Sequence, residues 1–183
     1  MVDAHRYTVT ETLRNGMAVT IRAVRPDDRE RLIAAFEKLE PESIYARFFS
    51  YKDELTDAEL KHYTEVDFDR RVVLLVTTGA GENESVIAAG SYAAYASSAD
   101  EHSAEVAFMV EEDYHGLGLA GRLLHHLGLI ARERGIKRLE AEVLPDNRAM
   151  RAVFARSGLS ITEERLDCTI RVTMELPGES HTD

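Results

Sequence analysis

Alternating apolar and polar residues at the start of the chain predict that it opens with two strands. Residues 7–13 and 17–24 alternate on either side of Asn15 and Gly16. Asn-Gly strongly favours a two-residue hairpin turn, because both residues tolerate a positive φ. We therefore expect an antiparallel hairpin within residues 7–24.

Helical periodicity replaces the alternation after Pro26, a residue suited to a first helical turn. The buried face of this helix is expected to consist of four apolar residues at helical spacing, namely Leu32, Ile33, Phe36 and Leu39. Two shorter helices are expected next. One follows Pro41, and the other is indicated by the capping pattern of Thr56 and Glu59.

Three apolar runs in the middle of the chain predict consecutive strands. They cover residues 71–78, 85–95 and 103–110, and the loops between them are short. Short loops join antiparallel neighbours, so the runs predict a meander. The remaining elements are expected to be a helix to about Arg134, a strand at 138–144, a helix from Asp146 to about Ser157, and strands at 159–166 and 169–176. Together these elements give an α+β domain with a mixed sheet.

The length and composition are those of an ordinary globular protein. The chain has 183 residues, of which 44% are hydrophobic and 30% charged, enough to bury a substantial core. We assign residues 1–176 to a single domain and residues 177–183 to a disordered tail. No apolar run reaches the roughly 18 residues of a membrane span, and no signal peptide precedes the hairpin. With the single Cys168, these features predict a cytoplasmic protein without a membrane partner.

The net charge of −11 at pH 7 narrows the classes of partner. It argues against nucleic-acid binding, which needs basic patches to displace counterions. It is compatible with a cationic substrate, such as an amine or a lysine-bearing protein. A homodimer is also compatible with the sequence.

A glycine cluster between the third strand of the meander and the next helix is the most informative stretch. Gly116, Gly118 and Gly121 follow a short acidic turn and precede an amphipathic run. Glycines let a backbone approach a ligand closely, and the free amides of a helix N-terminus favour negative charge. The stretch therefore predicts a pyrophosphate-binding turn.

A nicotinamide or flavin dinucleotide is one ligand that could use these glycines. GLGLAG has the form G-x-G-x-x-G, and Glu140 and Glu142 follow it by about twenty residues. In a dinucleotide-binding fold, however, the first glycine follows its strand almost directly. Here a polar turn separates the strand from Gly116, and only about 60 residues remain after Gly121. We therefore favour a different cofactor.

The stretch from His115 to Ala120 resembles the Q/R-x-x-G-x-G/A motif of the GNAT acetyltransferase superfamily, with histidine at the first position. The segment PDNRAMRAVFARSGL is similar to the second cofactor segment of that superfamily, including Asn147 and Gly158. The stretches IRAVRPDD, PESIYARFF, LTDAEL and VDFDRRVVLLV resemble, in this order, bacterial protein-lysine acetyltransferases of the Pat type.

The resemblance implies a GNAT-like mixed, mostly antiparallel central sheet flanked by helices on both faces. It also implies acetyl-CoA as acyl donor, with no metal. In the superfamily the glycine turn binds the pyrophosphate, and the preceding strand splays from the next one to pair with the pantetheine arm. The corresponding cofactor-binding positions are Phe108, Met109, Val110, His115, Gly116, Leu117, Gly118, Leu119, Ala120, Gly121, Asn147 and Phe154. Phe154 stands where many members have a thiolate-protonating tyrosine, which Pat-type proteins commonly lack.

Acyl transfer to an amine also needs a base, because a lysine amine with a pKa of about 10.4 is charged at pH 7. Glu105 is the candidate catalytic residue, and Pat-type enzymes carry a base glutamate in a similar A-E-x-A-F context. Both faces of its strand are otherwise apolar, so we expect a central strand and a partly buried carboxylate. The alternatives are that Glu105 pairs with an arginine, or that Glu142 is the base.

The sequence therefore predicts an N-acetyltransferase that moves an acetyl group from acetyl-CoA to a primary amine by direct attack. A protein lysine is the expected acceptor, with a small amine as the alternative, and a non-catalytic acyl-CoA sensor is the rival class. His125 and His126 are expected to be solvated rather than metal ligands, since adjacent helix positions do not share a face. Three aromatic residues are expected in the core or on the acceptor side, namely Tyr45, Phe48 and Phe49.

Overall fold

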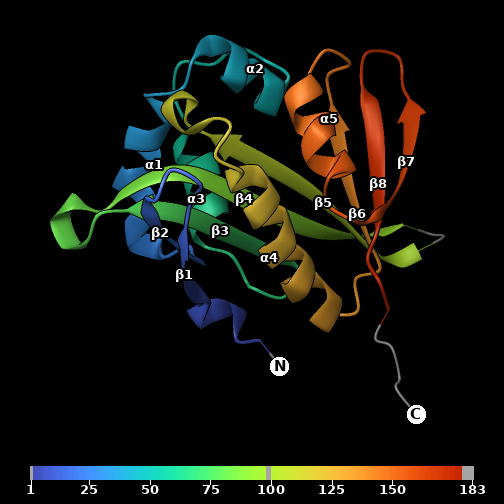
Figure 1. Ribbon diagram of the computed structural model, residues 1–183, viewed down its shortest axis with the longest axis horizontal. Coiled ribbons are helices and arrows are strands. Elements are labelled where there is room, and N and C mark those ends of the chain that lie inside the picture. Colours follow the sequence, from blue (N-terminus) through green and yellow to red (C-terminus); the bar gives the residue numbers. More distant parts are fainter. Residues whose placement is uncertain (1, 98–99, 179–183) are drawn as a thin grey trace.

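The structure, a computed structural model, describes residues 2–97 and 100–178 and contains one eight-stranded sheet (Figure 1). The strands are β1 (Thr8–Thr12), β2 (Ala18–Ala23), β3 (Arg71–Thr78), β4 (Ser85–Ser97), β5 (Asp100–Val110), β6 (Arg138–Val143), β7 (Ser160–Arg165) and β8 (Ile170–Glu175). They lie in the order β1-β2-β3-β4-β5-β6-β8-β7. Every neighbouring pair is antiparallel except β5–β6, which is parallel.

The expected hairpin and meander are both present. β1 and β2 pair antiparallel with Thr12 opposite Ala18, and Gly16 in the turn has a φ of 83°. The hairpin joins the edge of the β3–β4–β5 meander through β2, so β1 to β5 are neighbours in chain order. The predicted mixed, mostly antiparallel sheet is confirmed.

Helices cover both faces of the sheet, as predicted. The helices α1 (Arg29–Phe36), α2 (Pro41–Phe48) and α3 (Asp57–Thr64) lie on one face, and α4 (Leu119–Glu133) and α5 (Arg148–Ala155) lie on the other (Figure 1). The first helix begins with a 3₁₀ turn at Pro26–Asp28 before it becomes α-helical. No helix in the described ranges combines the length and apolarity that crossing a membrane requires.

The packing of α4 against the sheet is close, because one strand position has no side chain. A Cβ atom at Gly90 of β4 would lie 3.2 Å from the Leu123 Cβ and 3.1 Å from the Phe108 ring. The buried leucines on this side of α4 therefore approach the sheet more closely than a larger residue at Gly90 would allow. Only the turn of residues 111–118 separates β5 from this helix, so the contact also fixes where the helix N-terminus lies.

A buried ion network connects the hairpin to the helical layer. The guanidinium of Arg22 on β2 donates to both carboxylate oxygens of Asp28, at 2.8 and 2.7 Å, and its Nε donates to Glu84 at 2.8 Å. The side chain of Asp28 is fully buried. Burial alone would raise the pKa of Asp28, but hydrogen bonds from Arg22 and the Arg25 amide lower it. The network thus satisfies charges that would be costly if left alone.

The domain assignment for residues 1–176 stays a prediction. Of the expected tail at 177–183, residues 179–183 lie outside the described residues.

We expect Asp28→Asn to lower the free energy of unfolding by about 3 kcal/mol, because the buried Arg22 guanidinium loses its bidentate carboxylate partner and keeps Glu84 alone as counter-ion. Urea denaturation at pH 7 measures this, with the exposed neighbour Asp27→Asn as control. The folded pKa of Asp28 is depressed, so its contribution is complete above the unfolded pKa of about 3.9 and is lost as the pH falls through the folded value. Equal stability of the two variants at pH 7 would contradict the assignment.

Candidate functional site

The site is a gap between β5 and β6 that results from incomplete pairing. The two parallel strands are paired only at Ser103–Arg138, Ala104–Leu139 and Glu105–Glu140. Beyond Glu105, β5 continues to pair with β4 alone, up to Ala88 opposite Val110. The edge of residues 106–110 that faces the gap therefore has backbone groups without a strand partner, and an extended ligand can pair with them.

The glycine turn lies at the end of this open edge. Gly116 and Gly118 have φ values of 76° and 82°, a left-handed conformation that favours glycine. A Cβ at Gly116, Gly118 or Gly121 would meet no atom within 4 Å, so there is open space above the turn. In the described part of the chain, the amides of residues 116–121 donate to no protein acceptor. Free amides at the N-terminus of a fifteen-residue helix make an anion site.

The side chains of the turn have other roles. Leu119 and Ala120 are buried in the core and Leu117 is half-buried against it, so these three residues can reach a ligand through their amides only. His115 Nε2 donates to the carbonyl oxygen of Val110 at 2.9 Å, which ties the turn to the end of β5. The predicted residues on β5 and on the turn are therefore held together by a direct hydrogen bond.

The second predicted cofactor segment lies across the gap on α5. Asn147 caps this helix, because its Oδ1 accepts from the Met150 amide at 3.1 Å. Phe154 is 1% exposed, and its ring centroid lies 6.3 Å from that of Phe108. The two rings pack together beside the gap, and Phe154 offers no hydroxyl there. The structure thus brings the predicted residues of β5, the turn and α5 to one region.

The expected burial of Glu105 is wrong, because its side chain is exposed. The strand is central, as expected, but β6 diverges immediately after this residue. On the same face, α2 packs over the far end of β5, where Phe48 and Met109 pack against one buried cluster. Glu105 lies between β6 and α2, and neither of them covers it. Its carboxylate therefore reaches solvent at the point where β5 and β6 separate.

Acidic and phenolic groups surround Glu105. Glu140 lies opposite it on β6, and Tyr95 hydrogen-bonds to Glu140. Burial, with that hydrogen bond and the nearby carboxylates, raises the pKa of Tyr95 to about 12. Among the described residues Glu105 forms no ion pair, so the arginine pairing considered as an alternative is not found. Glu142 accepts a hydrogen bond from the Thr169 hydroxyl, away from the last β5–β6 pair.

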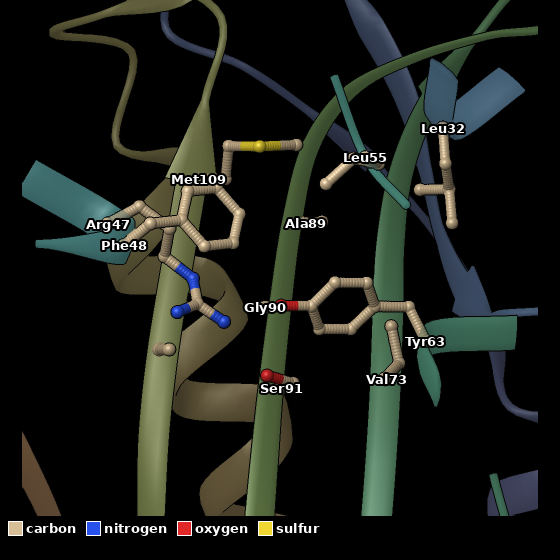
Figure 2. Close-up of a pocket in the computed structure, with 11 residues that line it drawn as sticks. Leu32, Arg47, Phe48, Leu55, Tyr63, Val73, Ala89, Gly90, Ser91 and Met109 are labelled. Atoms are coloured by element: carbon tan, nitrogen blue, oxygen red, sulfur yellow. The ribbon is translucent and has the colours of Figure 1, made fainter. Parts of the chain in front are cut away.

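A pocket opens on the same face of the sheet as Glu105 (Figure 2). It lies between the strands β3, β4 and β5 and the helical layer, and holds about 480 Å³ of empty space, counting the part open to solvent. Three aromatic residues are expected in the core or on the acceptor side. Of these, Phe48 lines the pocket, Tyr45 packs against the ring of Tyr51, and Phe49 is exposed. Arg47 is the charged residue that lines this pocket, and the sequence alone did not indicate it as a site residue.

The expectation that both helix histidines are solvated holds for His125 and is wrong for His126. His126 is 7% exposed, its Nε2 donates to the Glu11 carboxylate at 2.7 Å, and its Nδ1 is hydrogen-bonded to the Tyr7 hydroxyl at 2.5 Å. Arg122 also donates to Glu11. Burial would raise the pKa of Glu11, but the hydrogen bonds from His126 and Arg122 lower it. The cluster attaches α4 to β1.

Comparison with known proteins identifies relatives of this architecture. Residues 18–160 match the family model described as the acetyltransferase (GNAT) domain. The chain is 35% identical over 154 residues to the acetyltransferase Pat of Mycolicibacterium smegmatis. That alignment covers 84% of this chain and 45% of Pat, so the chain spans less than half the length of this relative.

Solved structures give the same result. The GNAT domain of S. lividans PAT superposes with a TM-score of 0.86 at 35% identity, covering 96% of this chain and all of that one. The yncA protein of Salmonella typhimurium, solved with its cofactor acetyl-CoA, superposes with a TM-score of 0.66 at 19% identity. The latter match covers 90% of this chain and 96% of that one, and it shows a shared fold.

We expect His126→Leu to lower the free energy of unfolding by about 1–3 kcal/mol, because Glu11 and Tyr7 then lose a hydrogen-bond partner in a partly buried cluster. The matched control is His125→Leu, one residue earlier and exposed, which should change stability by no more than about 0.5 kcal/mol. Urea denaturation of both variants makes the comparison, and a loss of the same size for both would contradict it.

Proposed function

This chain belongs to the GNAT acetyltransferase family, and on that basis we propose that it transfers an acetyl group from acetyl-CoA to a primary amine. The observation that supports this activity best is the β5–β6 gap, at whose end the six amides of residues 116–121 have no acceptor among the described residues. An extended acyl-CoA needs both features, an open strand edge for its arm and an anion site for its pyrophosphate. Bound there, it supplies an activated thioester.

The residues of the gap have separable roles in this proposal. The amides of residues 116–121 bind the pyrophosphate, and the free edge of residues 106–110 holds the pantetheine arm and polarises the thioester carbonyl. Asn147 and Phe154 act mainly by positioning α5 beside the gap, because one caps that helix and the other is buried. The acetyl-CoA in the yncA structure supports this cofactor.

Glu105 is the proposed general base. Its carboxylate is exposed at the point where β5 and β6 separate, so it can accept the proton of an incoming ammonium directly or through water. The neutral amine then attacks the thioester carbonyl, and the carbon–sulfur bond breaks. Amide formation releases a further proton from the amine nitrogen to solvent. Phe154 cannot protonate the departing thiolate, which leaves as the anion or takes a proton from solvent or from another group.

A protein lysine is the proposed acceptor, with a small amine as the alternative. The exposure of Glu105 favours an acceptor that reaches the site from outside, as a lysine on a protein surface does. The resemblance of the stretches IRAVRPDD, PESIYARFF, LTDAEL and VDFDRRVVLLV to Pat-type protein-lysine acetyltransferases supports the same class. The cytoplasmic location, a homodimer and the lack of nucleic-acid or membrane partners stay predictions.

Calorimetric titration tests the cofactor. We expect acetyl-CoA to bind saturably and NAD not to bind, because the gap and the glycine turn suit an extended acyl-CoA. Gly118→Ala should weaken acetyl-CoA binding several-fold, since a left-handed conformation costs an L-residue about 1–2 kcal/mol. Gly178→Ala, outside the turn, is the control. Binding of NAD in place of acetyl-CoA would overturn the cofactor proposal.

Glu105→Gln tests the base. We expect kcat to fall about 10²–10⁴-fold while the Kd for acetyl-CoA stays unchanged, because the amide keeps the shape of the side chain but accepts no proton. Glu142→Gln, which changes the other candidate, should retain activity within a few-fold. Steady-state rates with a lysine-bearing peptide provide the readout. If Glu105→Gln keeps full turnover, another group is the base; if the unmodified chain acetylates no amine, the acyl-CoA sensor is the better description.

A further inference from the structure

The pocket beside the proposed reaction centre is mostly apolar, with two hydroxyl groups, those of Tyr63 and Ser91, and one charged side chain, Arg47. Its walls include Phe48, Leu55, Tyr63 and Met109, and the small residues of β4 and β5 form its floor. Arg47 projects from α2 into this space, with its guanidinium directed toward the sheet near Gly90 and Ser91 (Figure 2). A guanidinium inside an apolar pocket is costly unless an anion accompanies it.

No anion of the described chain accompanies Arg47. Its contact is with the ring of Phe48, whose centroid lies 5.0 Å from Cζ, and it forms no salt bridge among the described residues. The nearby Lys52, by contrast, is paired with Glu59. The pKa of His62 is lowered by burial and then by the positive charges of Arg71 and Arg47. The pocket is therefore locally cationic, although the chain as a whole carries a net charge of −11.

This local charge restricts what can occupy the pocket. An ammonium group would meet an uncompensated positive charge there, so the reacting amine belongs nearer Glu105. An apolar chain alone would fill the walls but leave the guanidinium without an acceptor. A carboxylate carried on a short apolar chain meets both requirements. The carboxylate accepts the paired N–H donors of the arginine, and the chain contacts the aromatic and aliphatic walls.

We propose that this pocket is a carboxylate-binding subsite, with Arg47 as the counter-ion, which selects a reactant that carries a carboxylate on a short apolar chain. Ala107 and Met109 of β5 line it, on the same face as Glu105, so it adjoins the place where acyl transfer is proposed. The inference rests on the proposed function. Two reactants could carry the carboxylate: the donor, at the far end of its acyl group, or the amine acceptor.

Calorimetry with matched CoA thioesters tests the donor. Succinyl-CoA and butyryl-CoA have acyl chains of the same length and differ in the terminal carboxylate. If the donor carries the anion, succinyl-CoA should bind at least about tenfold tighter. Arg47→Met should abolish this preference, and Arg47→Lys should keep part of it, since lysine retains the charge but not the planar fork. Arg6→Met, which removes the same charge from an exposed side chain outside the pocket, should change nothing.

Matched amines test whether the acceptor carries the carboxylate. 5-Aminopentanoate and pentylamine have chains of the same length and differ in the terminal carboxylate, and their binding to the CoA-saturated protein can be titrated in the same way. If the acceptor carries the anion, 5-aminopentanoate should bind at least about tenfold tighter, with the same response to the variants at Arg47. Thermal denaturation of each variant shows whether it is folded as the unmodified chain is.

A carboxylate preference in either titration that disappears in Arg47→Met supports the subsite. No preference in both titrations, or a preference that survives Arg47→Met, overturns it. Acetyl-CoA binding distinguishes a failure of the subsite proposal from a failure of the proposed function, because Arg47 lies outside the pyrophosphate turn. Normal acetyl-CoA binding without a carboxylate preference overturns the subsite alone, whereas failure of the unmodified chain to bind acetyl-CoA overturns the proposed function and the subsite with it.

Discussion

The short parallel contact between β5 and β6 is the constraint on which the rest of the structure depends. Three residue pairs join the two strands before they diverge, and the sheet stays continuous through this contact. A longer pairing would close the gap and occupy the edge of residues 106–110. A shorter one would leave the β6–β8–β7 part of the sheet without its link to the meander. The gap therefore exists because the pairing ends at Glu105 while both strands continue.

The connection between these two strands supplies the second half of the site. Parallel neighbours need a crossover, which here consists of the glycine turn and α4. The helix packs on β4 at Gly90, so its N-terminus and the free amides of the turn are fixed beside the open edge of β5. The hydrogen bond from His115 to Val110 holds the turn to that strand. One crossover thus serves as both packing element and anion site.

The order of the elements could be predicted from the sequence because each has a local signal. Asn15-Gly16 marks the hairpin, and the glycines of the turn mark the start of α4. The exposure of Glu105 could not be predicted in this way. Alternation shows which residues share a face, but not where a neighbouring strand turns away or where the covering helix ends. His126 is different, because it stands three residues after Leu123 and four before Ile130, a spacing that places it on the buried face; its partners Glu11 and Tyr7, far away in the sequence, could not be predicted.

The attachment of α4 to the opening hairpin has a thermodynamic consequence. Glu11 and Tyr7, from β1 and the residue before it, hold His126 and Arg122 of the helix whose first turn makes the anion site. Any local opening that frees this edge strand also releases the helix it restrains. A ligand that binds only when the helix is in place must therefore suppress such openings, by an amount set by its own affinity and concentration. Amide hydrogens of β1, far along the chain from the glycine turn, then exchange with solvent more slowly when the turn is occupied.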